Sequence, residues 1–371
     1  MSNNLAIYVH WPFCKSKCPY CDFNSHVANK IDYNLWHKAY IKEIEHFKDY
    51  ISGKNITSIF FGGGTPTLMP PFIADAIISK FSKIANFDSN IEITLEGNPT
   101  SVELKKFNDF KTAGINRVSL GVQSLNNDNL KFLGREHSSS EALKAVEKAR
   151  IFDNYSFDLI YALPDQTLSQ WEKELTQALT YTKGHLSLYQ LTIEKGTKFY
   201  SDYRSGKFKM PQNDLSADFY NLTGSIMEKN GLPAYEVSNY AKSGYESKHN
   251  MTYWRYGDYL GIGAGSHSRI TLEGKTAIMM THSPDSWLKS VQEKGNGIQT
   301  HELLSEDEIN YEAIMMGLRI KEGIKEDIIK NKKQLALLIN EKLLEEKNGN
   351  IIATQSGLLV LNSLINSLVD N

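Results

Sequence analysis

The 371-residue chain has few cysteines, no long apolar run and almost no net charge. Its 41 Lys and Arg residues nearly balance 43 Asp and Glu residues, so it lacks the polycationic surface of general nucleic-acid-binding proteins, and we expect no nucleic-acid partner. A run of about 18 apolar residues is absent, so no membrane-spanning helix is predicted. The N-terminus leads directly into a strand-like segment, without the basic and apolar regions of a signal peptide.

The only cysteines are three residues in one short segment, Cys14-Lys-Ser-Lys-Cys18-Pro-Tyr-Cys21. An odd number cannot pair completely within the chain, which favours a reducing, cytoplasmic location. Thiols this close together in a reducing compartment indicate a metal-binding loop, although three inert buried thiols are the plain structural alternative.

Zinc and iron–sulfur remain the two metal alternatives for this loop. A structural zinc site needs four ligands, usually from two separated pairs, and no second pair of cysteines is present. A [4Fe–4S] cluster normally takes four cysteines, so three would leave one iron open to a small molecule.

With 41% hydrophobic and 23% charged residues, the chain can bury a substantial core and is neither disordered nor fibrous. The alternation of strand-like and helical segments predicts an α/β protein. Strand-like runs are predicted at 5–10, 58–61, 91–95, 117–121, 157–162 and 186–191. Helices are predicted at 33–51 with Asp32 as N-cap, 104–113 ending at Gly114, 140–152 and 170–181. About six strand–helix repeats indicate a parallel sheet, either an incomplete TIM-like barrel or an open doubly wound sheet.

Beyond about residue 200 the alternation breaks into aromatic and glycine-rich segments at 235–240 and 257–268. A helical stretch is predicted at 305–319, followed by helix 334–346, a turn at 348–350, strand 351–353 and helix 357–368. This order resembles a small winged-helix-like domain. Lys and Glu are evenly mixed along 321–347, which favours a solvated docking domain over a DNA-binding one.

The segment 7–21 resembles the C-x3-C-x2-C loop of the radical S-adenosylmethionine (SAM) family, in its HemN/HemW branch of coproporphyrinogen oxidases and haem chaperones. The resemblance covers residues 5–270 strongly. It implies an incomplete TIM-like (β/α)6 radical SAM barrel, with domains at 1–230, 231–300 and 301–371. It also implies a [4Fe–4S] cluster on Cys14, Cys18 and Cys21, with SAM chelated at the open iron.

The same resemblance implies a set of SAM contacts at the carboxyl ends of the strands, where a barrel places its site. Taken singly, each could be a core polar group or a turn residue. The implied contacts are Tyr8, Tyr20, Gly63, Gly64, Thr65, Glu96, Gln123, Arg135 and Asp158.

Two departures separate the chain from the oxidases of the branch. They continue the loop as C-x-C, whereas Phe23 stands at that position here, and they carry a long arm before the loop, whereas thirteen residues precede Cys14. Both features resemble the haem chaperones. We therefore expect a haem carrier without porphyrinogen oxidation, with oxygen-independent coproporphyrinogen III dehydrogenase as the alternative; SAM cleavage stays open.

A haem carrier needs an iron ligand and an apolar slot, and imidazole is a common ligand. The segment 249–254 resembles the HNxxYW motif of the chaperones, so His249, Tyr253 and Trp254 are haem candidates, with a loop-capping His249 as the structural alternative. His267 is a further candidate that a tight glycine-rich turn explains better.

His10 and His26 flank the cysteine loop and are expected to support it rather than to bind metal. The expected partners are haem and a haem-accepting protein, and a transient contact with a membrane protein stays a hypothesis. No heptad seam of coiled-coil length is present, so the sequence predicts no particular oligomeric state.

Overall fold

The computed structural model describes residues 3–28 and 30–369, and its main feature is one large curved sheet. Eleven strands form this sheet, in the order β13-β12-β11-β10-β1-β4-β5-β6-β7-β8-β9. The parallel strands are β10 (Tyr259–Ile262), β1 (Asn4–Trp11), β4 (Asn55–Gly63), β5 (Asn86–Gly97), β6 (Arg117–Gln123), β7 (Asn154–Tyr161) and β8 (His185–Gln190).

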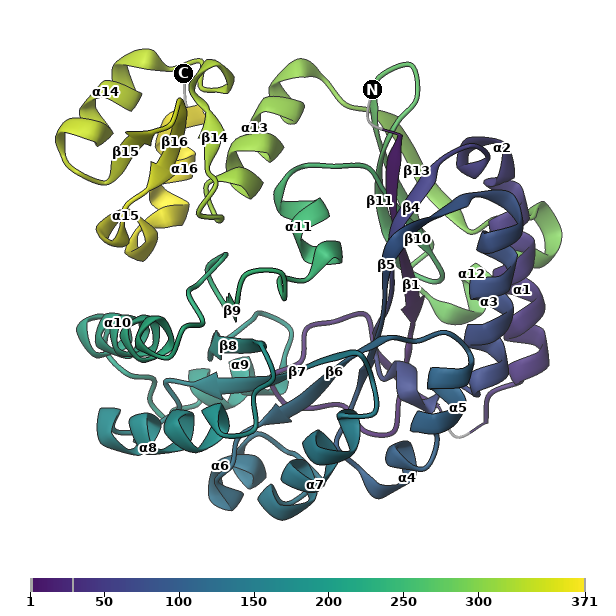
Figure 1. The fold of residues 1–371 in the computed structure, drawn as a ribbon, viewed down its shortest axis with the longest axis horizontal. Coiled ribbons are helices and arrows are strands. Elements are labelled where there is room, and N and C mark those ends of the chain that lie inside the picture. Colours follow the sequence, from purple (N-terminus) through teal and green to yellow (C-terminus); the bar gives the residue numbers. More distant parts are fainter. Residues whose placement is uncertain (1–2, 29, 370–371) are drawn as a thin grey trace.

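The sheet does not close, and Figure 1 shows it as an open arc. Antiparallel strands continue both ends: β9 (Asn239–Ala241) beside β8, and β11 (His267–Thr271), β12 (Lys275–Met280) and β13 (Ile298–Leu303) beyond β10. The six predicted strands and the incomplete barrel are confirmed. The seventh parallel strand, β10, comes from the glycine-rich segment 257–268, beyond the six strands that we predicted.

Helices line the outer side of the arc, as expected for parallel crossovers (Figure 1). Between the strands lie α1 (Tyr33–His46), α2 (Lys48–Ile51), α3 (Pro71–Ile84), α4 (Ser101–Leu104), α5 (Phe107–Thr112), α6 (Asn127–Phe132), α7 (Ser139–Ala149), α8 (Leu168–Leu179), α9 (Lys198–Arg204), α10 (Asn213–Lys229), α11 (Lys248–Trp254) and α12 (Pro284–Lys294). One apolar core between sheet and helices extends from Leu5 to Val291.

Local sequence explains where the first helices begin and end. Asp32 caps α1 by accepting a hydrogen bond from the Leu35 amide, as predicted. The predicted helix 33–51 is wrong in one respect, because it breaks at Phe47 into α1 and α2. Similarly, the predicted helix 104–113 is interrupted between α4 and α5. We did not predict α3, which begins with Pro71 at its first position.

The C-terminal residues form a second unit with its own apolar core (Figure 1). A small antiparallel sheet, β14-β16-β15, packs with helices in a winged-helix-like arrangement. Its elements are α13 (Glu306–Gly317), β14 (Ile324–Lys325), α14 (Lys332–Asn340), β15 (Leu344–Lys347), β16 (Asn350–Ala353), α15 (Gln355–Leu359) and α16 (Leu361–Val369).

Two predictions for this unit are corrected. Residues 344–346 lie in β15 rather than in a helix, because Leu344 and its neighbours pair with β16 across the turn at Asn348. The predicted helix 357–368 breaks at Val360, whose backbone leaves the helical conformation. The division into three domains stays a prediction, and we note that β10–β13 belong to the same sheet as β1–β8.

Two short strands, β2 (Phe13–Cys14) and β3 (His26–Val27), pair in parallel and bracket the cysteine loop. In the described part of the chain, no helix has the length and apolar character needed to cross a membrane.

Glu43 fastens α1 to the antiparallel end of the sheet. It is buried and accepts hydrogen bonds from the Gly263 amide at 2.8 Å, the Gly297 amide at 2.9 Å and the Trp287 indole at 2.9 Å. Three donors from two distant segments thus depend on one carboxylate.

We predict that Glu43→Ala lowers the free energy of unfolding by about 3 kcal/mol, because buried donors lose their acceptor. Glu45→Ala is the matched control: Glu45 lies on the same helix, but its carboxylate pairs with the lysines Lys48 and Lys80 at the surface, and we expect little change. Denaturant titration followed by tryptophan fluorescence measures both. Equal midpoints for the two variants would contradict the role of Glu43.

Candidate functional site

The carboxyl ends of the parallel strands surround one cavity of about 170 Å³. The three cysteines line it together with every predicted SAM contact except Tyr8. Its lining therefore includes Cys14, Cys18, Tyr20, Cys21, Gly63, Gly64, Thr65, Glu96, Gln123, Arg135 and Asp158. Residues separated by more than a hundred positions in the chain thus meet because parallel strands present the same ends to one edge.

Backbone contacts hold the cysteine loop against the end of β4. The Gly64 amide donates to the Trp11 carbonyl at 2.7 Å, and the Thr65 amide donates to the Phe13 carbonyl at 2.9 Å. A Cβ atom on Gly64 would lie 2.6 Å from the Phe13 oxygen, so this approach requires glycine. The neighbouring Gly63 has φ +109°, a conformation that also favours glycine.

A chain of hydrogen bonds connects two of the three cysteines. The Thr65 hydroxyl donates to the Cys14 sulfur at 3.4 Å, and the Asn98 amide group donates to Thr65 at 3.1 Å. Arg135 donates both to the Asn98 oxygen and, at 3.1 Å, to the Cys18 sulfur. Donors directed at the sulfurs stabilise thiolate ligands and tune the centre they bind.

We did not predict Asn98, although it lies two residues after Glu96 and immediately after the end of β5. It could have been predicted from its place in a polar segment directly after a buried strand, because the site residues of a barrel lie at the carboxyl ends of its strands.

Two carboxylates line the cavity from β5 and β7, the strands on either side of β6. Glu96 accepts from the Gly63 amide at 3.3 Å, and Asp158 accepts from the Ser119 hydroxyl at 3.3 Å. Burial and the nearby Asp158 raise the pKa of Glu96 to about 8. Burial also raises the pKa of Asp158 to about 6, against hydrogen bonds from Ser187 and Ser119. Such carboxyls suit a ligand with cationic or hydroxyl groups, which would favour their charged forms.

The remaining predicted contacts lie at different depths. Gln123 ends β6 with φ +72° and lines the cavity, while Tyr20 lies on the cysteine loop with its ring 6.2 Å from that of Phe199. Tyr8 lies deeper, in two adjoining cavities, and hydrogen-bonds the His10 imidazole at 3.0 Å.

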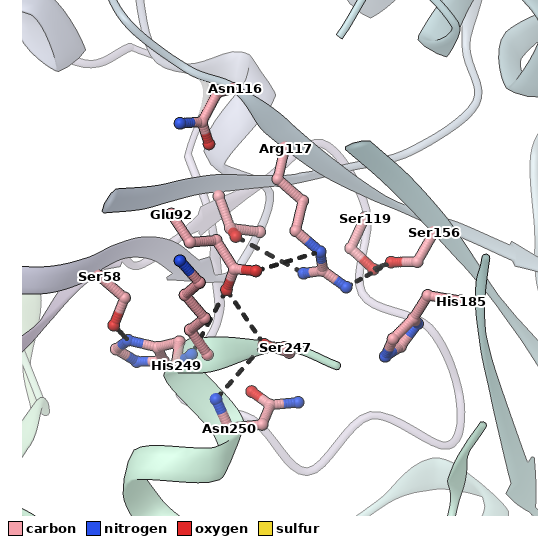
Figure 2. Close-up of polar contacts among 12 residues, drawn as sticks. Ser58, Glu92, Asn116, Arg117, Ser119, Ser156, His185, Ser247, His249 and Asn250 are labelled. Atoms are coloured by element: carbon pink, nitrogen blue, oxygen red, sulfur yellow. Dashed lines mark hydrogen bonds and ion pairs between the residues drawn. The ribbon is translucent and has the colours of Figure 1, made fainter. Parts of the chain in front are cut away.

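His249 is buried at 1% exposure on α11, inside the arc. One ring nitrogen hydrogen-bonds the Ser58 hydroxyl at 3.0 Å (Figure 2). The other hydrogen-bonds the Tyr253 hydroxyl at 2.7 Å, and the ring stacks on Phe60. Burial lowers the pKa of His249 to about 3, so its imidazole is neutral.

A buried ion pair that we did not predict fastens the start of α11. Figure 2 shows Arg117 of β6 beside Glu92 of β5, with 3.8 Å between Nε and the carboxylate. The same Glu92 accepts from the Ser247 hydroxyl and the His249 amide, both at 3.3 Å. Nothing in the residues around Glu92 or Arg117 predicts this contact, because the two residues lie on different strands and are 25 positions apart in sequence.

Tyr253 and Trp254, the other two haem candidates of the HNxxYW motif, lie in different surroundings. Tyr253 lines an open groove next to the cysteine cavity. Trp254 packs against a small apolar cluster that includes Met251 and Ile320, so it connects α11 to the C-terminal unit.

Comparison with known proteins gives the family. The model described as "Radical SAM superfamily" matches residues 8–178. A Haemophilus influenzae protein named heme chaperone HemW is 36% identical over 97% of both chains, and a Danio rerio protein named radical S-adenosyl methionine domain-containing protein 1, mitochondrial, is 40% identical over 86% of this chain and 73% of the relative. The chain belongs to the radical SAM family, in its HemN/HemW branch.

The solved structure of coproporphyrinogen III oxidase (HemN) from Escherichia coli has the same fold. It aligns with a TM-score of 0.83 and 22% identity, covering 99% of this chain and 90% of that one. The radical SAM barrel expected from the sequence is therefore confirmed.

The residues present fit the cofactors that this family implies. Three partly exposed thiols lie on one loop, two of them accept hydrogen bonds, and the cavity beyond them contains carboxylates, an amide and a guanidinium. This donor set suits a [4Fe–4S] cluster with SAM beside it.

We predict that Gly64→Ala impairs cluster assembly, because the added Cβ forces the Phe13–Cys14 backbone away at a cost of about 1–3 kcal/mol. Iron and sulfide per chain after anaerobic reconstitution should fall well below the wild-type values. Gly224→Ala, on α10 with no atom within 4 Å of the new Cβ, is the control and should reconstitute normally. Full iron content in Gly64→Ala would show that the close approach is dispensable.

Proposed function

We propose that this protein is a haem chaperone, which binds haem and passes it to an acceptor protein. The observation that carries the proposal is Phe23: at the position where the oxidases of the branch have a further cysteine, this chain has an exposed phenyl ring that lines both the cysteine cavity and the groove beside it. Relatives named heme chaperone HemW, matched along nearly their whole length, support it.

Cys14, Cys18 and Cys21 would hold the cluster, which when bound supplies an electron and an open iron for SAM. The chain's own contribution is placement. Arg135 suits the carboxylate of SAM, and Glu96 and Asp158 suit its ammonium and ribose hydroxyls.

Haem ligation by His249 also stays a proposal, and it has a condition. Both ring nitrogens of His249 are hydrogen-bonded, so iron binding there requires the bond to Tyr253 or to Ser58 to break. A cytoplasmic location stays a prediction, because relatives named mitochondrial also match.

Oxygen-independent coproporphyrinogen III dehydrogenase is the alternative, and the structural match to HemN shows the fold alone. This fold is shared by carriers and oxidases, so it does not separate them.

The two functions predict different outcomes for one anaerobic, reconstituted preparation. The chaperone takes up one hemin per chain in a Soret titration and yields no protoporphyrinogen from coproporphyrinogen III, SAM and a reductant. Product by chromatography would contradict the chaperone proposal. A colourless protein that contains zinc instead of iron and sulfide would contradict both functions.

We further predict that SAM affinity rises with pH if Glu96 contacts its ammonium group. Free Glu96, with a pKa near 8, must lose its proton to bind a cation, so affinity increases by up to about tenfold per pH unit between pH 6 and 8. Equilibrium dialysis of SAM against wild type and Glu96→Gln checks this. A wild-type slope that the glutamine variant reproduces would assign the pH dependence to another group.

A further inference from the structure

An open groove of about 510 Å³ adjoins the cysteine cavity. The two share Phe23, Gly63 and Glu96 in their linings. We call it the histidine groove; its lining comprises Tyr8, His10, Phe23, Asn24, Phe60, Gly63, Glu96, Tyr253, Tyr259, Gly265, Ser266, His267, His282 and Met316.

Flat aromatic rings form much of its wall. Phe23 is 62% exposed, and Phe60, Tyr253 and Tyr259 add rings from β4, α11 and β10. The volume lies within the range of pockets that enclose one organic ligand. A planar apolar molecule with polar edges is the ligand that such a wall suits.

Four of the ten histidines gather at this groove and its rim, although they are far apart in sequence: His10, His26, His267 and His282. His10 is fully engaged, with hydrogen bonds to Tyr8 and to the Asn24 carbonyl, and His26 bonds the Asn24 side chain. Among the described residues, the rings of His267 and His282 have no hydrogen-bond partner, and both are exposed.

Backbone hydrogen bonds hold the segment around His267 in place, although its ring has no hydrogen-bond partner among the described residues. It begins β11, in register with Met279 of β12. The preceding turn is closed by a hydrogen bond from the Ser266 amide to the Gly263 carbonyl at 3.1 Å, and Gly265 has φ +74°. A Cβ on Gly265 would lie 2.1 Å from the Asn24 amide, so the turn is packed against the cysteine loop.

Partial desolvation of the ring, with smaller contributions from Arg269 and His282, lowers the pKa of His267. A lower pKa favours the neutral imidazole, which is the form that binds a metal. A fixed backbone with a free neutral ring is the arrangement that a metal ligand needs.

We infer that haem binds in the histidine groove, with the His267 imidazole as an axial ligand to its iron and the aromatic wall against the porphyrin plane. This inference rests on the proposed haem function and names its site. Met316 of α13 lines the groove from the C-terminal unit, so cargo there would contact both units. The cargo would also lie beside Glu96 and Gly63, next to the SAM cavity.

His249 has a different role in this arrangement. Its hydrogen bond to the Tyr253 hydroxyl, and its own bond to Ser58, hold Tyr253 in the groove wall. His249 is thus a positioning residue, and its loss weakens haem binding without changing the ligands of the iron.

The experiment compares hemin binding and ligand signature in the full-length, reconstituted protein. For His267→Ala we expect affinity for hemin to fall by about tenfold or more, together with a changed electron paramagnetic resonance spectrum of the ferric haem. For His249→Ala we expect weaker binding with the wild-type spectrum. His301→Ala removes an exposed histidine of β13 outside the groove and should match wild type.

A second variant keeps the inference testable if His267→Ala folds poorly. Phe23→Ser removes an exposed ring that the groove shares with the cysteine cavity, and it should weaken hemin binding while leaving the ligation of the haem iron unchanged.

The outcomes distinguish a failure of the groove assignment from a failure of the chaperone function. Wild-type hemin binding with an unchanged signature in His267→Ala, or a changed signature in His249→Ala, would overturn the groove assignment while the chaperone function stands. If the wild-type protein binds no hemin, the function itself fails and the groove assignment with it.

Discussion

The structure depends on one hydrogen-bonded chain, from the Cys14 sulfur through Thr65, Asn98 and Arg135 to the Cys18 sulfur. Its members come from the cysteine loop, the ends of β4 and β5, and the segment after α6. Because each group donates to the next or to a sulfur, displacing one strand end disturbs the thiols on both sides. The chain thereby couples the geometry of the sheet to the electronic environment of the proposed cluster ligands.

Cofactor and cargo sites share walls in this fold. Glu96 and Gly63 belong to the cysteine cavity and to the histidine groove, and Tyr8 lines the groove and a third cavity beside it. A barrel that stays open leaves room for this second site on its concave side, where α11 enters. The buried pair of Arg117 and Glu92 keeps α11 there, and removal of either partner would leave an uncompensated charge in the interior.

The elements that were predicted correctly have strong local signals. The six strands are apolar runs bounded by turn residues, and the Asp32 cap precedes a helical stripe. Where the prediction failed, tertiary contacts outweighed a weak sequence pattern. The charged residues of β15 have a helical pattern, but in the structure they pair with β16 as a strand. The helix also breaks at Phe47, whose backbone leaves the helical conformation while its side chain is buried in the core.

The sequence alone determined the cysteine loop, the strand–helix order and the family resemblance, because these are properties of contiguous residues. It also placed Phe23 where the oxidases have cysteine. Only the tertiary structure decided which side chains meet: that Asn98 joins Arg135 to Thr65, that both nitrogens of His249 are engaged, and that His267 is not. Hydrogen-bond partners come from distant strands, and which of them share an edge is fixed only when the whole sheet has formed.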